Sequence, residues 1–202
     1  MDVVLKQKNS SIGVQSLIQI NNNTPGTGTT PIIPNFDSYN LGLFAIHQFH
    51  IGRLHAEAGG RYDFKYLDVA GYRYRRDAVN GDGSIEQYLL TDTRRFHNAS
   101  GTVGALYHIT PRLSWKSNLG LAWRAPSANE LYSDGVHHGS ATYELGDQQL
   151  RSEKGLKWMN TLIWNGERLQ FTADVYAQML YDYIYAQPNP DSVRQTIRGT
   201  FP

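Results

Sequence analysis

Alternating apolar and polar residues form the main pattern of the chain. Over residues 54–66, one set of alternate positions carries Leu, Ala, Gly, Tyr and Phe, while the other carries His, Glu, Gly, Arg, Asp and Lys. The alternation recurs over residues 113–123 and 169–181. Side chains of a β-strand point alternately to its two faces, so each segment predicts a strand with one apolar and one polar face. These strands exceed the usual length of about 5–6 residues and suit a bilayer crossing, which takes about 9–11 residues.

The connections between these strands alternate in length. Short turns are predicted at residues 50–53, 109–112 and 165–168, whereas long polar excursions are predicted at residues 70–95, at residues 124–151 and after Tyr185. Short periplasmic turns and longer extracellular loops are typical of an outer-membrane barrel. A soluble sandwich has no reason to gather its long loops at one end. We therefore predict an all-β, antiparallel, up-and-down transmembrane β-barrel of about eight strands, the first at residues 12–20.

Aromatic residues lie where the two edges of an apolar band are expected. Trp115 and Trp123 occupy the two ends of one predicted strand, both in its apolar phase. Their separation of eight residues corresponds to roughly 20 Å along a tilted strand, close to the height of an outer-membrane apolar band. Asn160 interrupts the apolar phase, and a local bulge is predicted there. Other aromatic residues expected in the two girdles are Tyr62, Tyr66, Tyr181, Tyr183 and Tyr185 beside the long loops, and Tyr107 and Trp164 beside the short turns.

Composition agrees with this prediction. The mean hydropathy is −0.48, and no run of about 18 apolar residues predicts a transmembrane helix. The chain has no cysteine, so cysteine usage does not identify its compartment. A net charge of +1 gives no argument for a nucleic-acid partner. No signal peptide is visible at the start, so an exported barrel would have lost its leader or be an internal piece.

Several short segments resemble one family. They are Ile33-Pro34, Leu43-Phe44-Ala45, Gly59-Gly60-Arg61-Tyr62-Asp63, WRAPSANELYSDG at residues 123–135 and IRGTFP at residues 197–202. In this order, over residues 31–202, the chain resembles the C-terminal barrel half of TonB-dependent outer-membrane receptors. Residues 123–135 are the most specific part of the resemblance.

The resemblance implies a fold and a function. Such receptors are barrels of about 22 strands with a plugged lumen. Residues 1–202 would then be part of the barrel domain, with the plug, the TonB box and the final strands outside them. The implied activity is TonB-energised uptake of an iron complex, haem or a metal across the outer membrane of a Gram-negative bacterium. The implied partners are outer-membrane lipid, the plug, the TonB complex through the N-terminal part, and a small iron or metal ligand.

The candidate site lies in the excursion at residues 124–151. Ser127 and Glu130 match a capping box, which predicts a short helix after Pro126. In haem receptors of the family, a histidine of the corresponding loop lies between an Arg-Ala-Pro box and an Asn-Pro-x-Leu box. The first box is present at residues 124–126, but the second position reads Gly-Asp-Gln-Gln-Leu at residues 146–150. Haem therefore remains one of several cargoes, beside a ferric siderophore and zinc, and no intrinsic cofactor is implied.

The expected site residues follow from ligand chemistry. A neutral imidazole binds haem iron, zinc or copper, and carboxylates complete zinc sites. The expected ligand-binding residues are His137, His138, Tyr132 and Arg124, and the expected metal ligands are His137, His138, Glu130 and Asp134. Alternatively, the two histidines are solvated, or they form hydrogen bonds with the plug or a siderophore. His47, His55, His97 and His108 are expected on strands as polar lumen or interface groups, and His50 in a turn.

Other functional classes have less support. No nucleophile–base pair, phosphate loop or zinc motif indicates an enzyme. Residues 80–83 predict a turn without the spacing of a calcium loop. Two alternatives stay open: a passive porin-like channel or small closed barrel, and a soluble β-rich binding module. A piece of a larger barrel would leave two strand edges unpaired, so it is expected to aggregate or require detergent, whereas a stable monomer without detergent would favour the soluble module.

Overall fold

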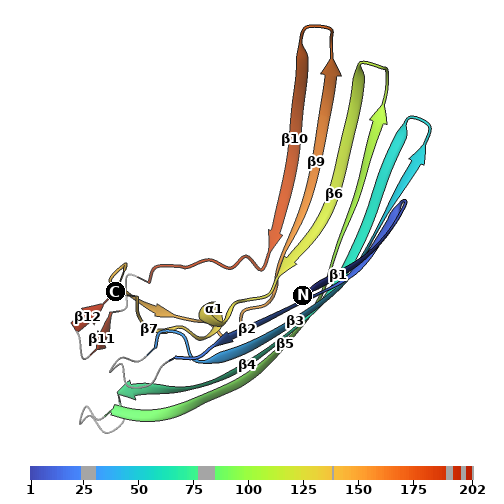
Figure 1. Ribbon diagram of the computed structural model, residues 1–202. Coiled ribbons are helices and arrows are strands. Elements are labelled where there is room, and N and C mark those ends of the chain that lie inside the picture. Colours follow the sequence, from blue (N-terminus) through green and yellow to red (C-terminus); the bar gives the residue numbers. More distant parts are fainter. Residues whose placement is uncertain (24–30, 77–84, 138, 190–192, 197–198, 202) are drawn as a thin grey trace.

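One curved antiparallel sheet contains most of the chain. The computed structural model describes residues 1–23, 31–76, 85–137, 139–189, 193–196 and 199–201. The sheet has eight strands in the order β1-β2-β3-β4-β5-β6-β9-β10 and bends into a trough (Figure 1). This confirms the predicted all-β antiparallel partial barrel. The strands are β1 (Asp2–Gln7), β2 (Ser10–Asn21), β3 (Phe36–Ile51), β4 (Leu54–Arg76), β5 (Ile85–His108), β6 (Leu113–Arg124), β9 (Glu153–Asn165) and β10 (Gln170–Tyr181).

The remaining elements are small and lie at one end of the trough. They are a helix, α1 (Ala128–Tyr132), and two hairpins that pair β7 (Asp134–His137) with β8 (Thr142–Leu145) and β11 (Arg194–Thr196) with β12 (Gly199–Phe201). In Figure 1, α1 lies on the concave side of the sheet, which we call the hollow face; the convex side is the outer face. No helix within the described ranges is long and apolar enough to span a membrane.

Short and long connections occupy opposite ends of the sheet, as predicted. Residues 8–9, 52–53, 109–112 and 166–169 join neighbouring strands at one end, where Gly52 has a φ of 58° that suits a tight turn. The ends of β2, β4 and β6 from which the long connections leave the sheet lie at the other end (Figure 1). Two expectations were wrong. The first strand is β1, because residues 12–20 belong to β2, and His50 lies within β3, because β3 continues to Ile51 before the turn.

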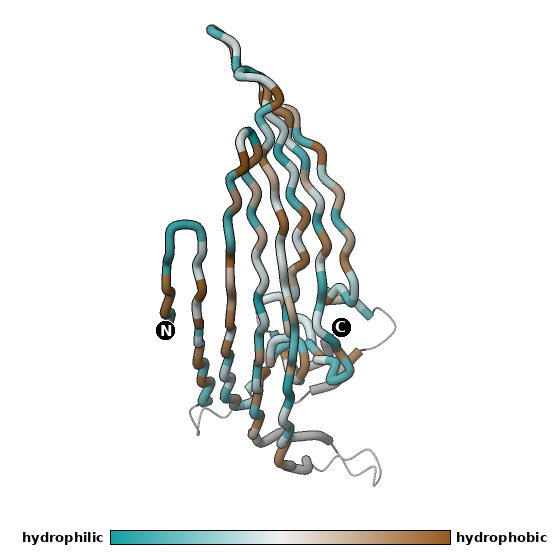
Figure 2. The backbone as a smooth tube through the Cα atoms, turned by 90° about the vertical axis from the view of Figure 1, so that its right-hand side faces the viewer, coloured by the Kyte–Doolittle hydropathy of each residue, from teal (hydrophilic) through white to brown (hydrophobic). Residues whose placement is uncertain are grey.

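Cross-strand pairing places residues of the same phase side by side, so the outward phase of one strand lies beside the outward phase of the next. Leu54 pairs with Tyr107, which pairs with Trp115, and all three occupy the outer phase. Large apolar side chains on this face remain exposed, among them Leu43, Val103, Leu119, Trp158 and Val175. Figure 2 shows apolar and polar residues alternating along the tubes of the long strands. The unburied apolar side chains are what the predicted contact with lipid requires.

The apolar phase of β4 changes face near its long-connection end. From His55 to Lys65 the hollow-face positions are mostly polar, but the next two, Leu67 and Val69, are apolar and only 1% exposed. On the outer face, Asp68 follows Tyr66 and is exposed. The apolar band of the outer face therefore ends near Tyr66, and beyond it the hollow face carries a small hydrophobic core.

Strands β4 and β5 continue beyond this point. The sequence predicted a loop at residues 70–95, but the two strands stay paired from Ala70 opposite Thr91 to Arg76 opposite Ile85. This expectation was wrong because it took polar residues as a sign of a loop. A strand that continues beyond the apolar band can carry polar side chains on both faces. Residues 80–83, where a turn was predicted, lie outside the described residues.

The sheet splits between β5 and β6. These strands pair only from Gly101 opposite Leu121 to His108 opposite Ser114, so the first part of β5 leaves β6. Trp123 was expected on the outer face. Instead, its indole Nε1 donates a hydrogen bond of 3.2 Å to Asp63 Oδ2, on the hollow face of β4. The indole nitrogen of Trp123 therefore faces the hollow side of the sheet.

Two further predictions differ from the structure: the bulge at Asn160, and the placement of Tyr183 and Tyr185 in an aromatic girdle. Asn160 pairs in continuous register with Ser117 and Val175, so the predicted bulge is wrong. Its Nδ2 is buried and has no hydrogen-bond partner among the described residues. Tyr183 and Tyr185 lie beyond the end of β10, where their rings stack at 5.9 Å, and so do not belong to a strand phase.

Substitution at adjacent positions tests which face meets lipid. Val103→Arg on the outer face should lower the free energy of unfolding by about 2–4 kcal/mol, the cost of arginine near a bilayer midplane. Thr102→Arg is the matched control, because Thr102 faces the hollow and loses only its hydrogen bonds with Asn118, worth about 1 kcal/mol. Denaturant unfolding of the full-length protein in lipid vesicles measures the free energy of unfolding of each variant. Equal destabilisation by the two substitutions would contradict the assignment of faces.

Candidate functional site

The connection from β6 to β9 folds back into the trough and begins with a capped helix (Figure 1). The backbone N–H of Ser127 donates to Glu130 Oε2 at 2.8 Å, and the Ser127 hydroxyl donates to the same oxygen at 2.7 Å. This carboxylate satisfies a backbone donor that the start of a helix would otherwise leave unpaired. The short helix predicted after Pro126 is therefore confirmed as α1.

A small hydrophobic core holds α1 against the hollow face. Ala128, Leu131 and Tyr132 are buried against Leu67 and Val69 of β4. Full burial of one such aliphatic side chain contributes about 1.5–3 kcal/mol, so the base of this connection is a packed structure. Partly buried residues that pack around this core are Ile33, Phe36, Leu90, Phe96 and Leu150.

Gly146 lets the returning chain approach α1 closely. A Cβ atom at this position would lie 2.5 Å from the backbone of Leu131 and Tyr132, so only glycine fits. The N–H of Gly146 donates to the Ser133 carbonyl at 2.7 Å, and the N–H of Asp147 donates to the Glu130 carbonyl at 2.9 Å. These bonds fasten the second half of the connection to the end of the helix.

Arg124 joins three segments at the base of the connection. Its Nη1 donates to both oxygens of Glu130 at 2.8 Å, and its Nη2 donates to Glu153 Oε2 at 3.2 Å. The end of β6, the helix and the start of β9 are thereby held together. Burial alone would raise the pKa of Glu130, but hydrogen bonds from Ser127 and Arg124 outweigh it and hold that pKa below its ordinary value.

A second polar cluster joins α1 to β5. The Tyr132 hydroxyl donates to Asp92 Oδ2 at 2.5 Å, and Arg94 Nε donates to the same oxygen at 2.8 Å. Arg94 Nη2 also donates to the Gln148 carbonyl at 2.7 Å. Burial and the bond to Asp92 raise the pKa of Tyr132 to about 12. Burial opposes ionisation of Asp92, but the bonds from Tyr132 and Arg94 prevail and lower its pKa.

The predicted site residues fall into two groups. Arg124, Glu130 and Tyr132 hold the base of the connection, and Tyr132 is only 3% exposed. Towards the tip, Asp134 Oδ1 accepts a hydrogen bond of 2.7 Å from the Tyr143 hydroxyl. His137 is exposed, with its Nδ1 2.9 Å from Ser140 Oγ and 3.2 Å from Glu144 Oε1.

The described part of the chain does not assemble the predicted metal ligands. Within it, no three histidine or acidic side chains converge closely enough to hold an ion. His138 lies outside the described residues. A ligand role for His137 and His138 therefore stays a prediction. Asp92 and Arg94 were missed because they lie in a segment expected to be a loop.

The hollow face also contains a cavity that the sequence did not predict. It is open to solvent, measures about 500 Å³ and is lined by residues of the strands from β1 to β6. Arg61 lines it, forms an ion pair of 2.6 Å with Asp63, and lies 5.9 Å from the centre of the Phe44 ring. The polar residues at the inward positions of β4 could have indicated a polar inner face. The shape of the cavity, however, depends on strands that are distant in sequence.

Comparison with known proteins identifies the barrel type. The sequence profile described as "TonB dependent receptor-like, beta-barrel" matches residues 8–200. The fold is similar to that of a structure named "Copper transporter OprC", with a TM-score of 0.62 and 20% identity over 89% of this chain and 29% of that chain. It is also similar to a structure of a double mutant of the Serratia marcescens hemophore receptor HasR in complex with its hemophore HasA and heme. That match has a TM-score of 0.59 and 16% identity, and it covers 88% of this chain and 31% of that chain. The chain thus spans less than a third of either protein.

Replacement of Arg124 tests the anchor at the base. Arg124→Gln should speed hydrogen exchange of the α1 amides by about fivefold, because the Arg124 side chain is 44% exposed and its pairs with Glu130 and Glu153 contribute about 1 kcal/mol. Arg112→Gln is the matched control, since its 2.8 Å ion pair with Glu167 is exposed and joins two short turns. That pair is more exposed than the pairs of Arg124 and does not touch α1, so its loss should leave α1 exchange unchanged. Unchanged α1 exchange in Arg124→Gln would show that the ion pair does not hold the connection.

The pKa shifts predict the pH range over which the β6–β9 connection stays packed against the hollow face. The lowered pKa values of Asp92 and Glu130 mean that their contribution is present above about pH 4–5 and is lost as pH falls further. The raised pKa of Tyr132 means that its contribution is present below about pH 10 and is lost as pH approaches about 12. A spin label at Gln149→Cys should therefore be least mobile between these limits. Mobility that does not change with pH would contradict the role of both clusters.

Proposed function

The chain belongs to the family of TonB-dependent receptor-like β-barrels, and on this premise we propose that it forms part of the wall and extracellular mouth of an outer-membrane receptor. The receptor takes up an iron complex, haem or a metal ion in a Gram-negative bacterium, driven by energy transmitted through TonB. The exposed apolar outer face supports contact with lipid, and the opposite placement of short and long connections supports the orientation.

The observation that carries this proposal is the β6–β9 connection. Its base is fixed to the hollow face by the core around Leu131 and by Arg124, while its tip presents His137 and Glu144 to solvent. A fixed base with an exposed polar tip suits a loop that contacts cargo at the mouth of a barrel. A loop folded into the lumen would also narrow a passive pore, so it is the family match that supports a receptor over a passive channel.

The hollow face suits contact with a plug contributed by another part of the full-length protein. Arg61, Asp63 and Lys65 lie on this face of β4, and the cavity of about 500 Å³ leaves room for side chains of a second domain. The TonB complex would act on that plug rather than on the wall described here. In this arrangement, cargo enters among the long connections and leaves past the short turns.

The cargo class follows from donor chemistry. The exposed His137 imidazole lies beside the Glu144 carboxylate, a nitrogen and oxygen pair that suits zinc, copper or iron. The two similar structures are named for copper transport and for a complex with heme, which agrees with a metal or haem cargo. A ferric siderophore remains the third member of the same class.

Uptake by the full-length receptor tests the proposal. The double substitution His137→Ala plus His138→Ala should reduce uptake of one cargo among haem, zinc and a ferric siderophore by tenfold or more, because direct ligands are removed. His47→Ala is the control, since His47 forms its 2.7 Å hydrogen bond with Ser10 on the outer face. Unchanged uptake of all three cargoes would remove the two histidines from the site. Uptake that persists without the proton-motive force would contradict a TonB-driven receptor and favour a passive channel.

A further inference from the structure

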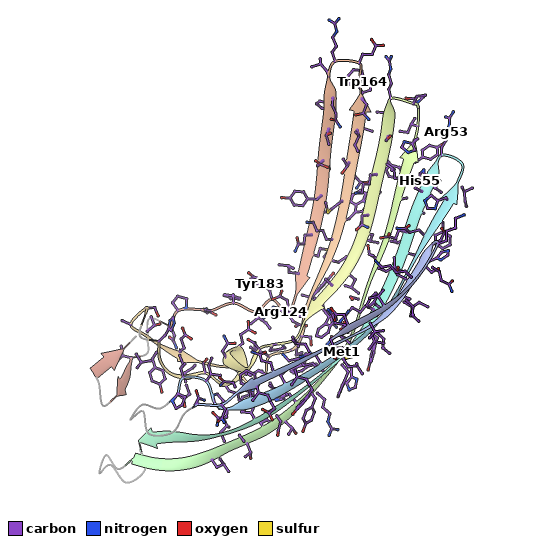
Figure 3. All side chains as sticks on the ribbon, in the orientation of Figure 1. Met1, Arg53, His55, Arg124, Trp164 and Tyr183 are labelled. Carbon is purple, nitrogen blue, oxygen red and sulfur yellow. The ribbon has the colours of Figure 1, made fainter. Side chains whose placement is uncertain are left out.

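A second, smaller pocket lies between the hollow face and α1. It measures about 260 Å³ and is lined chiefly by residues of β2, β3, β4 and α1. It shares no lining residue with the larger cavity at Arg61. Figure 3 shows Arg124, at the end of β6, far from Arg53 and His55 at the short turns. Because Arg124 holds α1 in place, the pocket lies at the long-connection end of the trough.

The pocket carries a positive charge that is not neutralised within its lining. Among the described residues that line it, Lys65 is the only charged one. Its Nζ donates a hydrogen bond of 3.2 Å to the Pro126 carbonyl, and an ammonium group has three donors, so donors remain for a ligand. Glu130 of α1 does not line the pocket and already accepts bonds from Arg124 and Ser127. The lining therefore suits an anion.

A buried hydroxyl lies beside this ammonium group. Ser38 is only 2% exposed and lines the pocket. Its Oγ accepts a bond of 3.4 Å from Asn40, but no acceptor for its own O–H lies among the described residues. Buried polar groups usually have partners, so the hydroxyl indicates a missing acceptor. Lys65 pairs with Asn40, which makes Ser38 its diagonal neighbour on the same face, within reach of a long side chain.

Apolar side chains form the other part of the wall. Leu67 is 1% exposed, and Ile33 and Phe36 are partly buried in the same hydrophobic core. At the mouth, the exposed side-chain amides of Gln19 and Asn129 form no hydrogen bond within the described ranges. Binding sites combine such apolar walls with a few placed polar groups, and those for drug-sized ligands exceed about 300 Å³. This pocket therefore suits a small molecule or one arm of a larger one.

We propose that this pocket binds an organic carboxylate, which accepts hydrogen bonds from Lys65 and Ser38 while its carbon skeleton packs against Phe36 and Leu67. Hydrogen bonds between an ammonium group and a carboxylate are among the strong ones. The carboxylate belongs either to a small free acid or to one arm of an iron complex. Recognition of cargo through this group rests on the proposed function, whereas binding of the acid depends only on the pocket.

Titration of the purified full-length protein with 4-fluorobenzoate, followed by fluorine NMR in detergent micelles, tests the inference. The His137→Ala plus His138→Ala background makes the result independent of the proposed cargo ligands, and empty micelles correct for partition. We expect saturable binding, and binding of the uncharged 4-fluorobenzamide that is weaker by tenfold or more. Lys65→Met should weaken 4-fluorobenzoate binding by tenfold or more, because a charged hydrogen bond is lost, whereas Lys65→Arg should retain most of it.

Lys116→Met is the matched control, because Lys116 is an exposed lysine of the hollow face that does not line the pocket. It should leave the affinity unchanged. Asn129→Ala, at an exposed position of α1, should weaken binding by about threefold and repeats the test in case Lys65→Met disturbs folding, which heat-dependent gel mobility checks.

Competition separates the two sources of the carboxylate. Displacement of 4-fluorobenzoate by citrate alone would assign the pocket to a free acid, and displacement only by ferric citrate would assign it to an iron complex; both support the inference. The inference is overturned if 4-fluorobenzamide binds as tightly as 4-fluorobenzoate, or if folded Lys65→Met protein binds 4-fluorobenzoate with the affinity of its parent. Because no transport is measured, loss of the proposed uptake function would leave this result unaffected.

Discussion

Each strand residue sends its side chain to the face opposite that of its neighbours, and cross-strand pairing carries this alternation through all eight strands of the sheet. The outer face can therefore stay apolar while the hollow face stays polar, although each strand is amphipathic. Beyond Tyr66 the pattern inverts, and the same strand that presents Phe64 outward presents Leu67 and Val69 inward. The inversion sets the height of the apolar band and places a hydrophobic core at the mouth of the trough.

That core determines how the β6–β9 connection behaves. Leu131 and Tyr132 pack against β4, and the ion pair of Arg124 with Glu130 and the bonds of Tyr132 with Asp92 surround this packing. Charged groups so close to apolar side chains are stable because each has a partner. The base is consequently packed and hydrogen-bonded, and in the function proposed above contact with a ligand falls to the exposed tip. Two of the residues expected to bind ligand, Arg124 and Tyr132, have partners that hold this base, and their ligand role stays a prediction.

Local features of the structure were predictable from sequence, whereas long-range ones were not. Alternation, short turns and the capping box of Ser127 with Glu130 depend on neighbouring residues, so most strands, the short turns and α1 were predicted. β1 and the paired extension of β4 and β5 within residues 70–95 were not. The hydrogen bond from Trp123 to Asp63 joins residues 60 positions apart, and no local pattern encodes it. The bond from Tyr132 to Asp92 joins residues 40 positions apart.

The central claim is that the outer face of this sheet meets lipid up to Tyr66 while the hollow face meets water. The chain has no cysteine, so single cysteines introduced over residues 56–70 can be spin-labelled one at a time in the full-length protein in lipid vesicles. Collisions with oxygen and with a water-soluble nickel complex then report lipid and water access at each position. We predict period-two alternation, with oxygen access highest at the even-numbered positions through Tyr66 and lost at Asp68. Uniform water access at all positions would contradict the claim.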